Sequence, residues 1–391
     1  MNKLQQRFNP QVNQIAVSLI RQFDERVSSI PNILRLTLGE PDFNTPEAVK
    51  AAGIEAIEQN FSHYTGMAGL PEVREAACAF IKKKYQLEYD WQTEAIVTVG
   101  GTEAISAALL SILEPGDKVL LPSPVYPGYA PVITLANAEM VNMDTSHDGF
   151  VLTPELLEST LKGHGEAVKA VVLNYPSNPT GVTYSREEVK ALADVLKKYN
   201  VFVISDEIYS ELIYDGTHTS IAEFIPEQTI LINGLSKSHA MTGWRIGFIF
   251  APQELTKEII KVHQYLVTAA STISQKAAYV ALTTSIDEGQ KVKQEYKVRR
   301  DFVYNKMTEM GFEVAKPSGA FYIFAKIPAN KEQDSMAFCV DVAEKVQLAV
   351  IPGIAFGQAG EGYIRISYAA SSEQLEEAMK RLANYMESTI A

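Results

Sequence analysis

The chain has 391 residues, of which 46% are hydrophobic and 21% are charged, a composition typical of a globular protein long enough for two domains. Its formal net charge of -12 argues against a general nucleic-acid-binding surface, since such surfaces are basic. The polar start (MNKLQQRFNPQ) and the lack of a long apolar run predict neither a signal peptide nor a membrane span, so we expect a cytoplasmic protein.

Between about residue 90 and residue 250, short apolar segments alternate with helical patterns. The sequence predicts strands at 95–101, 118–124, 170–176, 201–207, 229–236 and 245–251, and helices at 102–113 and 186–199. Ser185 and Glu188 form a capping box for the second of these helices. Because nearly continuous apolar strands alternate with helices, we expect an α/β fold whose mainly parallel sheet is covered by helices on both faces.

From about residue 290 the pattern changes to a long charged helix, the apolar segments GAFYIFAKI and YIRISYA, and a last helix with a capping box at Ser371 and Gln374. This order predicts a smaller α+β domain. We therefore expect an amino-terminal arm with part of the small domain at 1–44, a large cofactor-binding domain at 45–290 and the small domain at 291–391.

Cysteines and basic runs carry little functional signal. Cys78 and Cys339 are too few for a disulfide framework, and no CxxC pair suggests a metal site, so we expect both to be reduced and structural. The basic runs IKKKY (81–85) and KVRR (297–300) are expected to form solvated helix faces.

The strand at 229–236 ends beside Lys237, which lies among serine and glycine residues. Partial burial there lowers the pKa of a lysine amine from its usual ~10.4 and makes it a nucleophile near neutral pH. Ser236 precedes the lysine, Arg245 follows it, and both can donate hydrogen bonds to a phosphate. An amine nucleophile beside a phosphate clamp suits pyridoxal phosphate (PLP), although an isolated segment of this kind also fits an ordinary loop lysine.

Two other strand ends carry matching groups, since ligands of open α/β sheets bind beyond the carboxyl ends of the strands. In GGTE (100–103), Gly101 and Thr102 open a helix whose amino terminus can bind phosphate, or they form a plain turn. In SDEIY (205–209), Asp206 can pair with a pyridinium nitrogen, or it is a helix N-cap. Tyr209, expected one helical turn on, can reach the phenolic oxygen of the cofactor.

Two proline-rich turns add partners for a planar ring. NYPSNPTG (174–181) fixes Asn178, a donor and acceptor, and PVYPGY (124–129) fixes Tyr126, an aromatic that can stack. Each also fits an ordinary turn or packing residue. A lysine, an acid, phosphate donors and ring partners at successive strand ends jointly favour a PLP site.

Over essentially its whole length the chain resembles the fold-type I, class I/II PLP-dependent aminotransferases. The matching segments are LTLGEPDF (36–43), HYTGMAGLPEVREA (63–76), NYPSNPTGVTY, SDEIYSELIY, NGLSKSHAMTGWRIGF, KPSGAFYIF (316–324) and GEGYIRISYA (360–369). The chain looks closest to the aromatic amino acid aminotransferases of Gram-positive bacteria, and the N-acetyl-diaminopimelate aminotransferases are a near relation.

Most roles that the resemblance implies concern the cofactor. Lys237 resembles the Schiff-base lysine, Asp206 the partner of the pyridine nitrogen and Tyr126 the stacking aromatic. Asn178 and Tyr209 resemble the donors to the ring's phenolic oxygen. The residues that resemble the phosphate cup are Gly101, Thr102, Ser236 and Arg245.

The remaining implied roles concern the substrate and a second subunit. Arg365 matches the arginine that binds the substrate's α-carboxylate, and Gly39 and Asn178 lie near that position. By itself, Arg365 on a strand also fits a surface or ion-paired residue. Tyr64 matches a tyrosine that reaches the phosphate of the neighbouring subunit's cofactor, which implies a homodimer with shared sites.

The resemblance implies an aminotransferase (EC 2.6.1.-) that moves the amino group of an aromatic L-amino acid to 2-oxoglutarate by a ping-pong Schiff-base mechanism. No residue can be assigned to a distal carboxylate of the substrate. Ile15, Val17 and Leu19 either close over an aromatic side chain or belong to a helix packed on the core.

Other functions remain open. One is an N-acetyl-LL-diaminopimelate aminotransferase of lysine biosynthesis, and another is a PLP-dependent C–S lyase, which would release pyruvate and ammonia. A transcriptional regulator would need a DNA-binding domain ahead of the fold, yet LTLGEPDF begins at residue 36. A catalytically dead scaffold is disfavoured because every chemical position is filled.

Overall fold

The computed structural model describes residue 4 and residues 7–388. Residues 1–3, 5–6 and 389–391 therefore lie outside the described residues. They belong to the outer ends of the expected amino-terminal arm and of the expected small domain. Within the described residues, no helix combines the length and the apolar character that crossing a bilayer requires.

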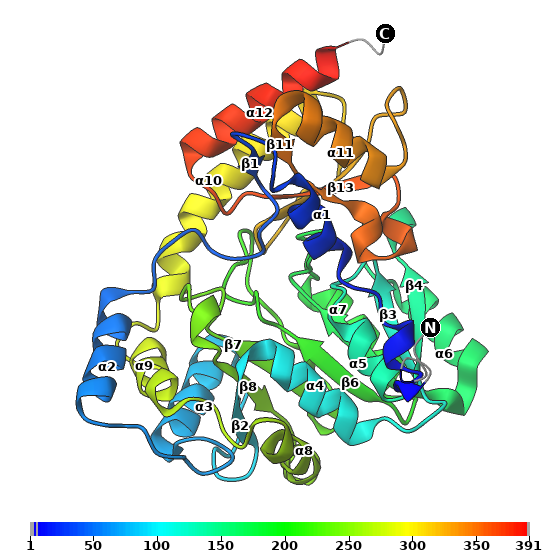
Figure 1. Ribbon diagram of the computed structural model, residues 1–391. Helices are drawn as coiled ribbons and strands as arrows, with labels where there is room; N and C mark the ends of the chain where they lie inside the picture. The colour runs from blue at the N-terminus through cyan, green and yellow to red at the C-terminus, as the bar shows by residue number, and fades with distance from the viewer. Residues whose placement is uncertain (1–3, 5–6, 389–391) are drawn as a thin grey trace.

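A seven-stranded sheet occupies the lower part of the molecule in Figure 1. Its strand order is β2-β8-β7-β6-β5-β3-β4. β8 pairs antiparallel with both of its neighbours, and the other pairs are parallel. The strands are β2 (Ala95–Thr98), β3 (Lys118–Ser123), β4 (Glu139–Asp144), β5 (Val168–Asn174), β6 (Phe202–Asp206), β7 (Thr229–Gly234) and β8 (Gly247–Phe250). The predicted mainly parallel sheet is confirmed.

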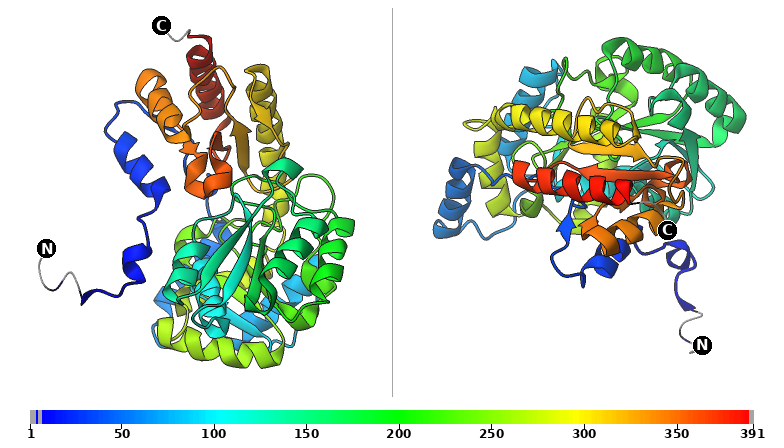
Figure 2. Two further views of the ribbon diagram at one scale, coloured as in Figure 1. Left: turned by 90° about the vertical axis from the view of Figure 1, so that its right-hand side faces the viewer. Right: turned by 90° about the horizontal axis from the view of Figure 1, so that it is seen from above.

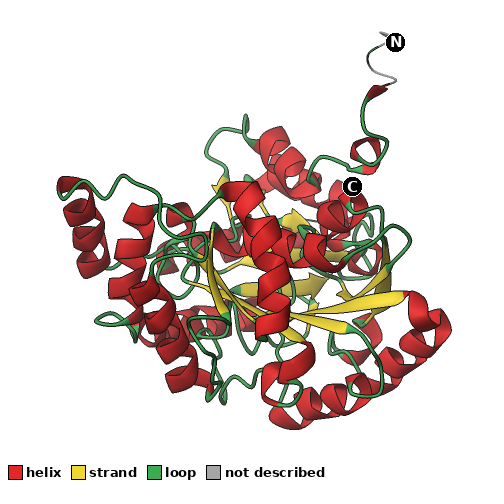
Figure 3. Ribbon diagram, turned by 90° about the horizontal axis from the view of Figure 1, so that it is seen from below, coloured by secondary structure: helices red, strands yellow, loops and turns green. Residues whose placement is uncertain are grey.

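Helices cover both faces of this sheet, as Figure 3 shows. Successive strand residues alternate between two apolar layers, because strand side chains point to opposite faces with a period of two. One layer packs against α4 (Gly100–Ile112), α5 (Tyr129–Leu135) and α8 (Gln253–Val267). The other packs against α3 (Pro71–Tyr85), α6 (Pro154–His164), α7 (Arg186–Leu196) and α9 (Thr272–Leu282), and α2 (Glu47–Glu58) lies against α9.

A smaller antiparallel sheet, ordered β12-β13-β10-β9, lies above the first in Figure 1. Its strands are β9 (Glu313–Val314), β10 (Tyr322–Lys326), β12 (Ile351–Pro352) and β13 (Tyr363–Ser367), and its helices are α10 (Glu288–Glu309), α11 (Ser335–Val346) and α12 (Ser372–Glu387). The expected boundary at 290/291 thus falls inside α10. The division of the chain into domains stays a prediction.

The amino-terminal segment runs along both parts of the molecule (Figure 2). Its helix α1 (Leu19–Val27) contacts α11, and β1 (Leu34–Arg35) pairs in parallel with β11 (Leu348–Ala349). Phe23 and Val27 of α1 are buried in the same apolar core as β10 and β13. Residues far apart in sequence are in this way held beside the carboxyl ends of the large sheet.

The capping boxes and the two helices predicted from the sequence are present, but the bounds of the helices differ from the prediction. Both capping boxes are present, at Ser185 with Glu188 and at Ser371 with Gln374. The helix predicted at 102–113 begins two residues earlier, at Gly100, and the one predicted at 186–199 ends at Leu196. The two cysteines are buried and free, as expected.

The expectation that the basic runs are solvated was wrong for three residues. Arg299 and Arg300 are buried, because α10 packs against loops whose acids, Asp42 and Asp215, pair with them at 2.7 and 3.0 Å. Lys84 is largely buried between two acids of neighbouring loops. Charge pairing with loops distant in sequence leaves no periodic signal in the runs themselves.

Candidate active site

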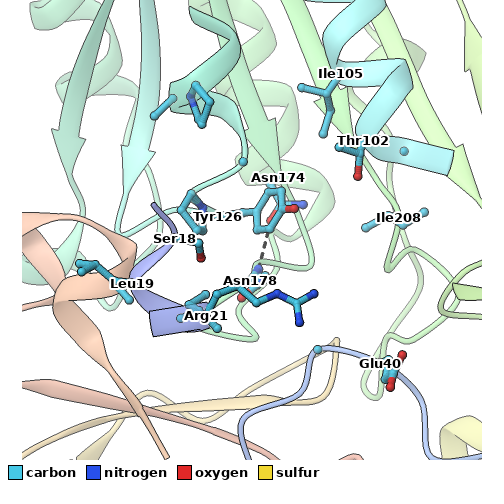
Figure 4. Close-up of a pocket in the computed structure, with 18 of the residues that line it drawn as sticks. Ser18, Leu19, Arg21, Glu40, Thr102, Ile105, Tyr126, Asn174, Asn178 and Ile208 are labelled. Carbon is cyan, nitrogen blue, oxygen red and sulfur yellow. Dashed lines mark hydrogen bonds between the residues drawn. The ribbon is translucent and has the colours of Figure 1, made fainter. Parts of the chain in front are cut away.

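A cavity of about 860 Å³ opens at the carboxyl ends of β5, β6 and β7, between the large sheet, the small sheet and the amino-terminal segment (Figure 4). All but one of the site residues predicted from the sequence line it: Gly39, Gly101, Thr102, Tyr126, Asn178, Asp206, Tyr209, Ser236, Lys237, Arg245 and Arg365. Tyr64 lies outside this cavity and is 87% exposed.

Lys237 follows β7, every residue of which is buried, and its amine points into the cavity. Nζ donates a hydrogen bond to the carbonyl oxygen of Gly39. Burial lowers the pKa of Lys237 to about 8; the nearby Glu40 carboxylate opposes this shift, and the guanidinium of Arg365 adds to it. An appreciable fraction of the amine is therefore unprotonated, and so nucleophilic, near neutral pH.

Asp206 is the last residue of β6, and its carboxylate is buried beside the cavity. It accepts hydrogen bonds from Tyr129 Oη at 2.6 Å and from the Ile208 backbone nitrogen at 3.3 Å. Burial raises the pKa of Asp206 to about 6, although the bond from Tyr129 works in the other direction. No basic side chain of the described chain forms an ion pair with it. A cationic ring nitrogen would supply the missing partner.

Tyr209 lies in a hydrogen-bonded turn over residues 208–211, so the helical turn predicted after Asp206 was wrong. The backbone instead closes through bonds from Ser210 to Glu207 and from Leu212 to Tyr209. Tyr209 Oη and Tyr322 Oη are 2.8 Å apart, and Lys237 Nζ lies 5.7 Å from the centre of the Tyr209 ring. The tyrosine is thus next to the amine, and its predicted hydrogen bond to the phenolic oxygen of the cofactor stays a prediction.

The start of α4 forms an open cradle for an anion. Gly101 and Thr102 are in its first turn, and the N-cap residue makes no side-chain capping bond, so backbone N–H groups there are free to bind a phosphate. Arg245 lies against Gly100: a Cβ atom at Gly100 would come within 2.5 Å of Arg245 Nη2. Gly100 also has φ +74, a conformation that favours glycine. Ser236 lines the cavity beside Lys237.

Arg365 on β13 is 2% exposed and has no acidic partner in the described chain. Nη1 donates to Asn178 Oδ1 at 2.9 Å, Nη2 donates to the Thr37 carbonyl at 2.7 Å, and Nε has no partner. The guanidinium carbon lies 4.6 Å from the centre of the Tyr322 ring and 4.9 Å from that of the Phe356 ring. A buried cation without a counter-ion is costly, which indicates that a carboxylate belongs here.

Arg365 is therefore neither a surface residue nor an ion-paired one. Its neighbours Ile364 and Ile366 point into the core of the small sheet, so the alternation along β13 turns the arginine toward the cavity.

Tyr126 is held on a turn that leaves room for its ring. A Cβ atom at Gly128 would lie 2.3 Å from the Tyr126 ring, so glycine is needed there. The ring meets Tyr129 edge-on at a centroid distance of 5.6 Å, and burial raises the pKa of the Tyr126 hydroxyl. Because Tyr126 also lines the cavity, its ring can stack on a planar cofactor.

The amino-terminal segment lines the cavity with Ile15, Val17 and Leu19. The first two precede α1, which starts at Leu19, and Val17 is 71% exposed. The alternative of a helix packed on the core is therefore wrong for Ile15 and Val17, because α1 begins only after them.

Sequence reasoning missed four residues of the site. Tyr129, Tyr322 and Asn174 stand in segments that were recognised as motifs, but nothing in a motif shows which of its aromatic or amide side chains point inward. Asn174 Nδ2 donates to the Asp206 carbonyl at 3.0 Å, so it supports the end of β6. Arg21 of α1 also lines the cavity, and no motif contains it.

The site as a whole fits PLP and an amino acid. Four groups in the site each lack one partner. They are an amine with a lowered pKa, a buried acid without a cation, an open phosphate cradle and a buried arginine without an anion. PLP would supply the aldehyde, the pyridinium and the phosphate. The carboxylate for Arg365 would come from the substrate.

Comparisons with known proteins place this chain in a family. The model for "Aminotransferase class I and II" matches residues 31–382. A probable N-acetyl-LL-diaminopimelate aminotransferase of Bacillus subtilis is 50% identical over 374 residues, which are 96% of this chain and 94% of the relative.

Two further similar proteins carry other substrate names. An aspartate aminotransferase of Pyrococcus horikoshii is 40% identical over 376 residues, 95% of each chain. The crystal structure of an aromatic aminotransferase from the same organism superimposes with a TM-score of 0.87 at 37% identity, covering 93% of this chain and 98% of that one. These names agree on amino-group transfer and differ in the amino acid.

Proposed function

The chain belongs to the class I and II aminotransferases, and on that premise we propose that it moves the amino group of an L-amino acid to 2-oxoglutarate in a ping-pong cycle. It is a PLP-dependent enzyme of fold type I with amino acid and 2-oxo acid substrates. One observation carries the proposed chemistry: a lysine amine with a pKa of about 8 shares a cavity with an arginine that is buried without a counter-ion.

Each of the main residues then has a definite task. When bound, PLP supplies an electron sink that makes the Cα proton of the amino acid acidic. Arg365 binds the α-carboxylate through its planar donor edge and so fixes the orientation of Cα. Lys237 Nζ removes the proton from Cα as the general base. Asp206 holds a proton on the ring nitrogen, and Tyr126 fixes the plane of the ring.

For the donor, we propose N-acetyl-LL-diaminopimelate as the first candidate, because the relative with that name is 50% identical over 96% of the chain. The aromatic donor (Phe, Tyr or Trp) predicted from the sequence is the second candidate. It is supported by the apolar segment at Ile15, Val17 and Leu19 and by the likeness to an aromatic aminotransferase.

A donor panel tests these proposals. The purified enzyme is loaded with PLP, 2-oxoglutarate is the acceptor, and glutamate formation is followed with each amino acid. We expect N-acetyl-LL-diaminopimelate to have the highest kcat/KM; an aromatic amino acid in first place would establish the second candidate. Pyruvate and ammonia from a sulfur amino acid, without glutamate from any donor, would contradict the proposal and indicate a lyase.

A homodimer with shared sites is also a proposal. Tyr64 is exposed and outside its own chain's cavity, which suits a residue whose partner lies in another subunit. Light scattering of the purified protein checks the mass, and Tyr64→Phe should weaken PLP binding if the tyrosine reaches the partner's cofactor. A cytoplasmic location stays a prediction from the sequence.

A further inference from the structure

Two buried ionisable side chains next to the phosphate cradle have no part in the chemistry described so far. Glu103 lies in the first turn of α4, the helix whose start forms the cradle, and is 9% exposed. His263 of α8 is completely buried, and α8 packs against α4 (Figure 1). Neither side chain lines the cavity. Burying an acid or a histidine is costly without a hydrogen-bond partner, so the partners of both indicate their role.

The Glu103 carboxyl group bonds both to the backbone and to the histidine. Oε2 accepts a hydrogen bond from the Val99 backbone nitrogen at 3.1 Å. Val99 is the N-cap residue of α4, so this bond fixes the turn from β2 into the helix. Oε1 lies 3.0 Å from His263 Nδ1. The acid is thus bonded to the residue before the helix, and the N–H groups of the first helical turn stay available to an anion.

His263 is held from its other side by a backbone carbonyl. Nε2 donates to the Met67 carbonyl oxygen at 2.9 Å, because a carbonyl oxygen can only accept. Met67 belongs to the loop 63–70, which is also bonded to β2, since the Val97 nitrogen donates to the Ala68 carbonyl at 2.9 Å. The imidazole therefore bridges this loop and the first turn of α4.

These hydrogen bonds fix the net charge of the pair. Nε2 carries a hydrogen, so without a further proton Nδ1 would present a lone pair to a carboxylate oxygen 3.0 Å away, and two acceptors would face each other. The contact therefore requires a proton, either on Nδ1 beside an ionised Glu103 or on the Glu103 carboxyl group beside a neutral imidazole. In both arrangements the net charge of the pair is zero.

This neutrality matters because the adjacent cradle binds an anion. A phosphate at the start of α4 is stabilised by the positive end of the helix dipole. A negative carboxylate in the first turn would interact with the same end of the dipole and would repel the phosphate. Because the proton shared with His263 cancels that charge, the dipole remains available to the phosphate.

We propose that Glu103 and His263 are positioning residues of the phosphate cradle, and that their shared proton keeps a buried negative charge away from the phosphate. The ligand class is a phosphate monoester, here the phosphate of PLP. The inference goes beyond the proposed function, since it rests on PLP as the cofactor and not on the amino acid that the enzyme uses. It gives a histidine outside the motifs recognised in the sequence a part in holding the cofactor.

The test compares His263→Phe with the double variant that adds Glu103→Gln, each as the full-length chain. Both are titrated with PLP and with pyridoxal, which has the same ring and aldehyde but no phosphate, and the absorbance of the lysine adduct gives each Kd. In His263→Phe the carboxylate loses the group that shares its proton. We therefore expect the Kd of PLP to rise about tenfold and that of pyridoxal to change less than about twofold. Removing the acid as well should return the Kd of PLP to within about threefold of the wild-type value.

His218→Phe is the matched control. It removes the histidine of a second buried pair, His218 with Glu207, and neither residue of that pair lines the cavity. The control should lower the unfolding temperature as His263→Phe does, but it should change the Kd values of PLP and pyridoxal by the same factor. A change in their ratio therefore reports the cradle and not a general loss of stability.

Three results would overturn the proposal: an unchanged Kd of PLP in His263→Phe, an equal loss of PLP and pyridoxal, or a double variant that binds PLP as weakly as the single one. Each would show that the pair only supports the fold. If His263→Phe does not fold, His263→Gln replaces it with the same expectations, because glutamine can still donate to the Met67 carbonyl but cannot carry the extra proton. If no donor supports transfer, the proposed function fails, and the titrations still decide the role of the pair.

Discussion

Two walls of the same cavity are built in different ways. The cofactor wall consists of residues at the ends of buried parallel strands, such as Asp206 after β6 and Lys237 after β7. The substrate wall is assembled from the amino-terminal segment and the small sheet, where Arg21 and Arg365 stand more than 300 residues apart in the chain. Strand topology alone fixes the first wall, whereas the second depends on how distant segments pack.

This difference should separate the effects of mutations. Changes on the cofactor wall should alter how PLP is held or used with every substrate. Changes on the substrate wall should leave bound PLP unaltered and alter the choice and affinity of the amino acid.

The largest effect is expected on the cofactor wall from Lys237→Ala. Removing the amine takes away both the nucleophile and the base, so turnover should fall about 10,000-fold or more. PLP should still bind through the phosphate cradle, without the absorbance of its lysine adduct. Steady transamination and the absorbance spectrum measure the two consequences, and a variant that keeps wild-type turnover would remove Lys237 from the mechanism.

On the substrate wall, Arg365→Lys should lower kcat/KM about 100-fold for every amino donor. A lysine cannot reproduce the planar pair of donors, although it keeps the charge. The absorbance of bound PLP should match that of the wild type, because the cofactor wall is untouched. An altered PLP spectrum with unchanged kcat/KM would show that Arg365 affects the cofactor and not the binding of the amino donor.

The pKa of Asp206 makes the cofactor wall sensitive to pH when PLP is absent. Native Asp206 keeps its proton up to about pH 6, whereas its ordinary pKa is 3.8, so its stabilising contribution is full below about pH 4 and is lost as the pH rises through 6. In the PLP-free protein, Asp206→Asn should lose less free energy of unfolding between pH 4 and pH 7 than the wild type, by about 3 kcal/mol at most.

Denaturant unfolding at several pH values measures this difference. Asp148→Asn, which changes an exposed acid outside the cavity, is the matched control and should follow the wild type. Identical pH profiles for Asp206→Asn and the wild type would mean that Asp206 does not titrate in this range. With PLP bound, the same substitution should weaken the holoenzyme instead, because the ring nitrogen loses its acid.

The two walls also differ in how far the sequence predicts them. Lys237, Asp206 and Thr102 follow strands whose apolar runs are visible in the sequence, and the carboxyl ends of parallel strands meet at one edge. Arg365 was predicted through a motif, and in the structure the alternation along β13, with Ile364 and Ile366 in the core, explains its direction. Arg21 has no such signal, because its place depends on the packing of α1 against the small sheet and not on any local pattern.

The remaining differences have similar causes. Tyr209 was expected on a helix, but backbone hydrogen bonds among residues 207–212 close a turn instead. The apolar pattern of the strand before it does not predict such hydrogen bonds. The buried state of Arg299 and Arg300 depends on acids in loops distant in sequence. Periodicity predicts elements and their inward faces, whereas ion pairs between distant loops leave no periodicity.

The smallest effect tests whether the cofactor wall depends on backbone as well as on side chains. Gly100→Ala places a methyl group within 2.5 Å of Arg245 Nη2 at a residue with φ +74, so both the backbone and the arginine must shift. Because left-handed geometry costs a residue with a Cβ about 1–2 kcal/mol, we expect PLP affinity to fall about tenfold. Titration of PLP absorbance measures the affinity.

Gly163→Ala in α6 is the control, since nothing lies within 4 Å of its added methyl group and alanine suits a helix better than glycine. It should bind PLP as the wild type does and be slightly more stable. If Gly100→Ala also binds PLP normally, Arg245 can move without loss, and the phosphate is held mainly by the backbone of α4. That outcome would make the cofactor wall a property of the strand-to-helix turn rather than of its arginine.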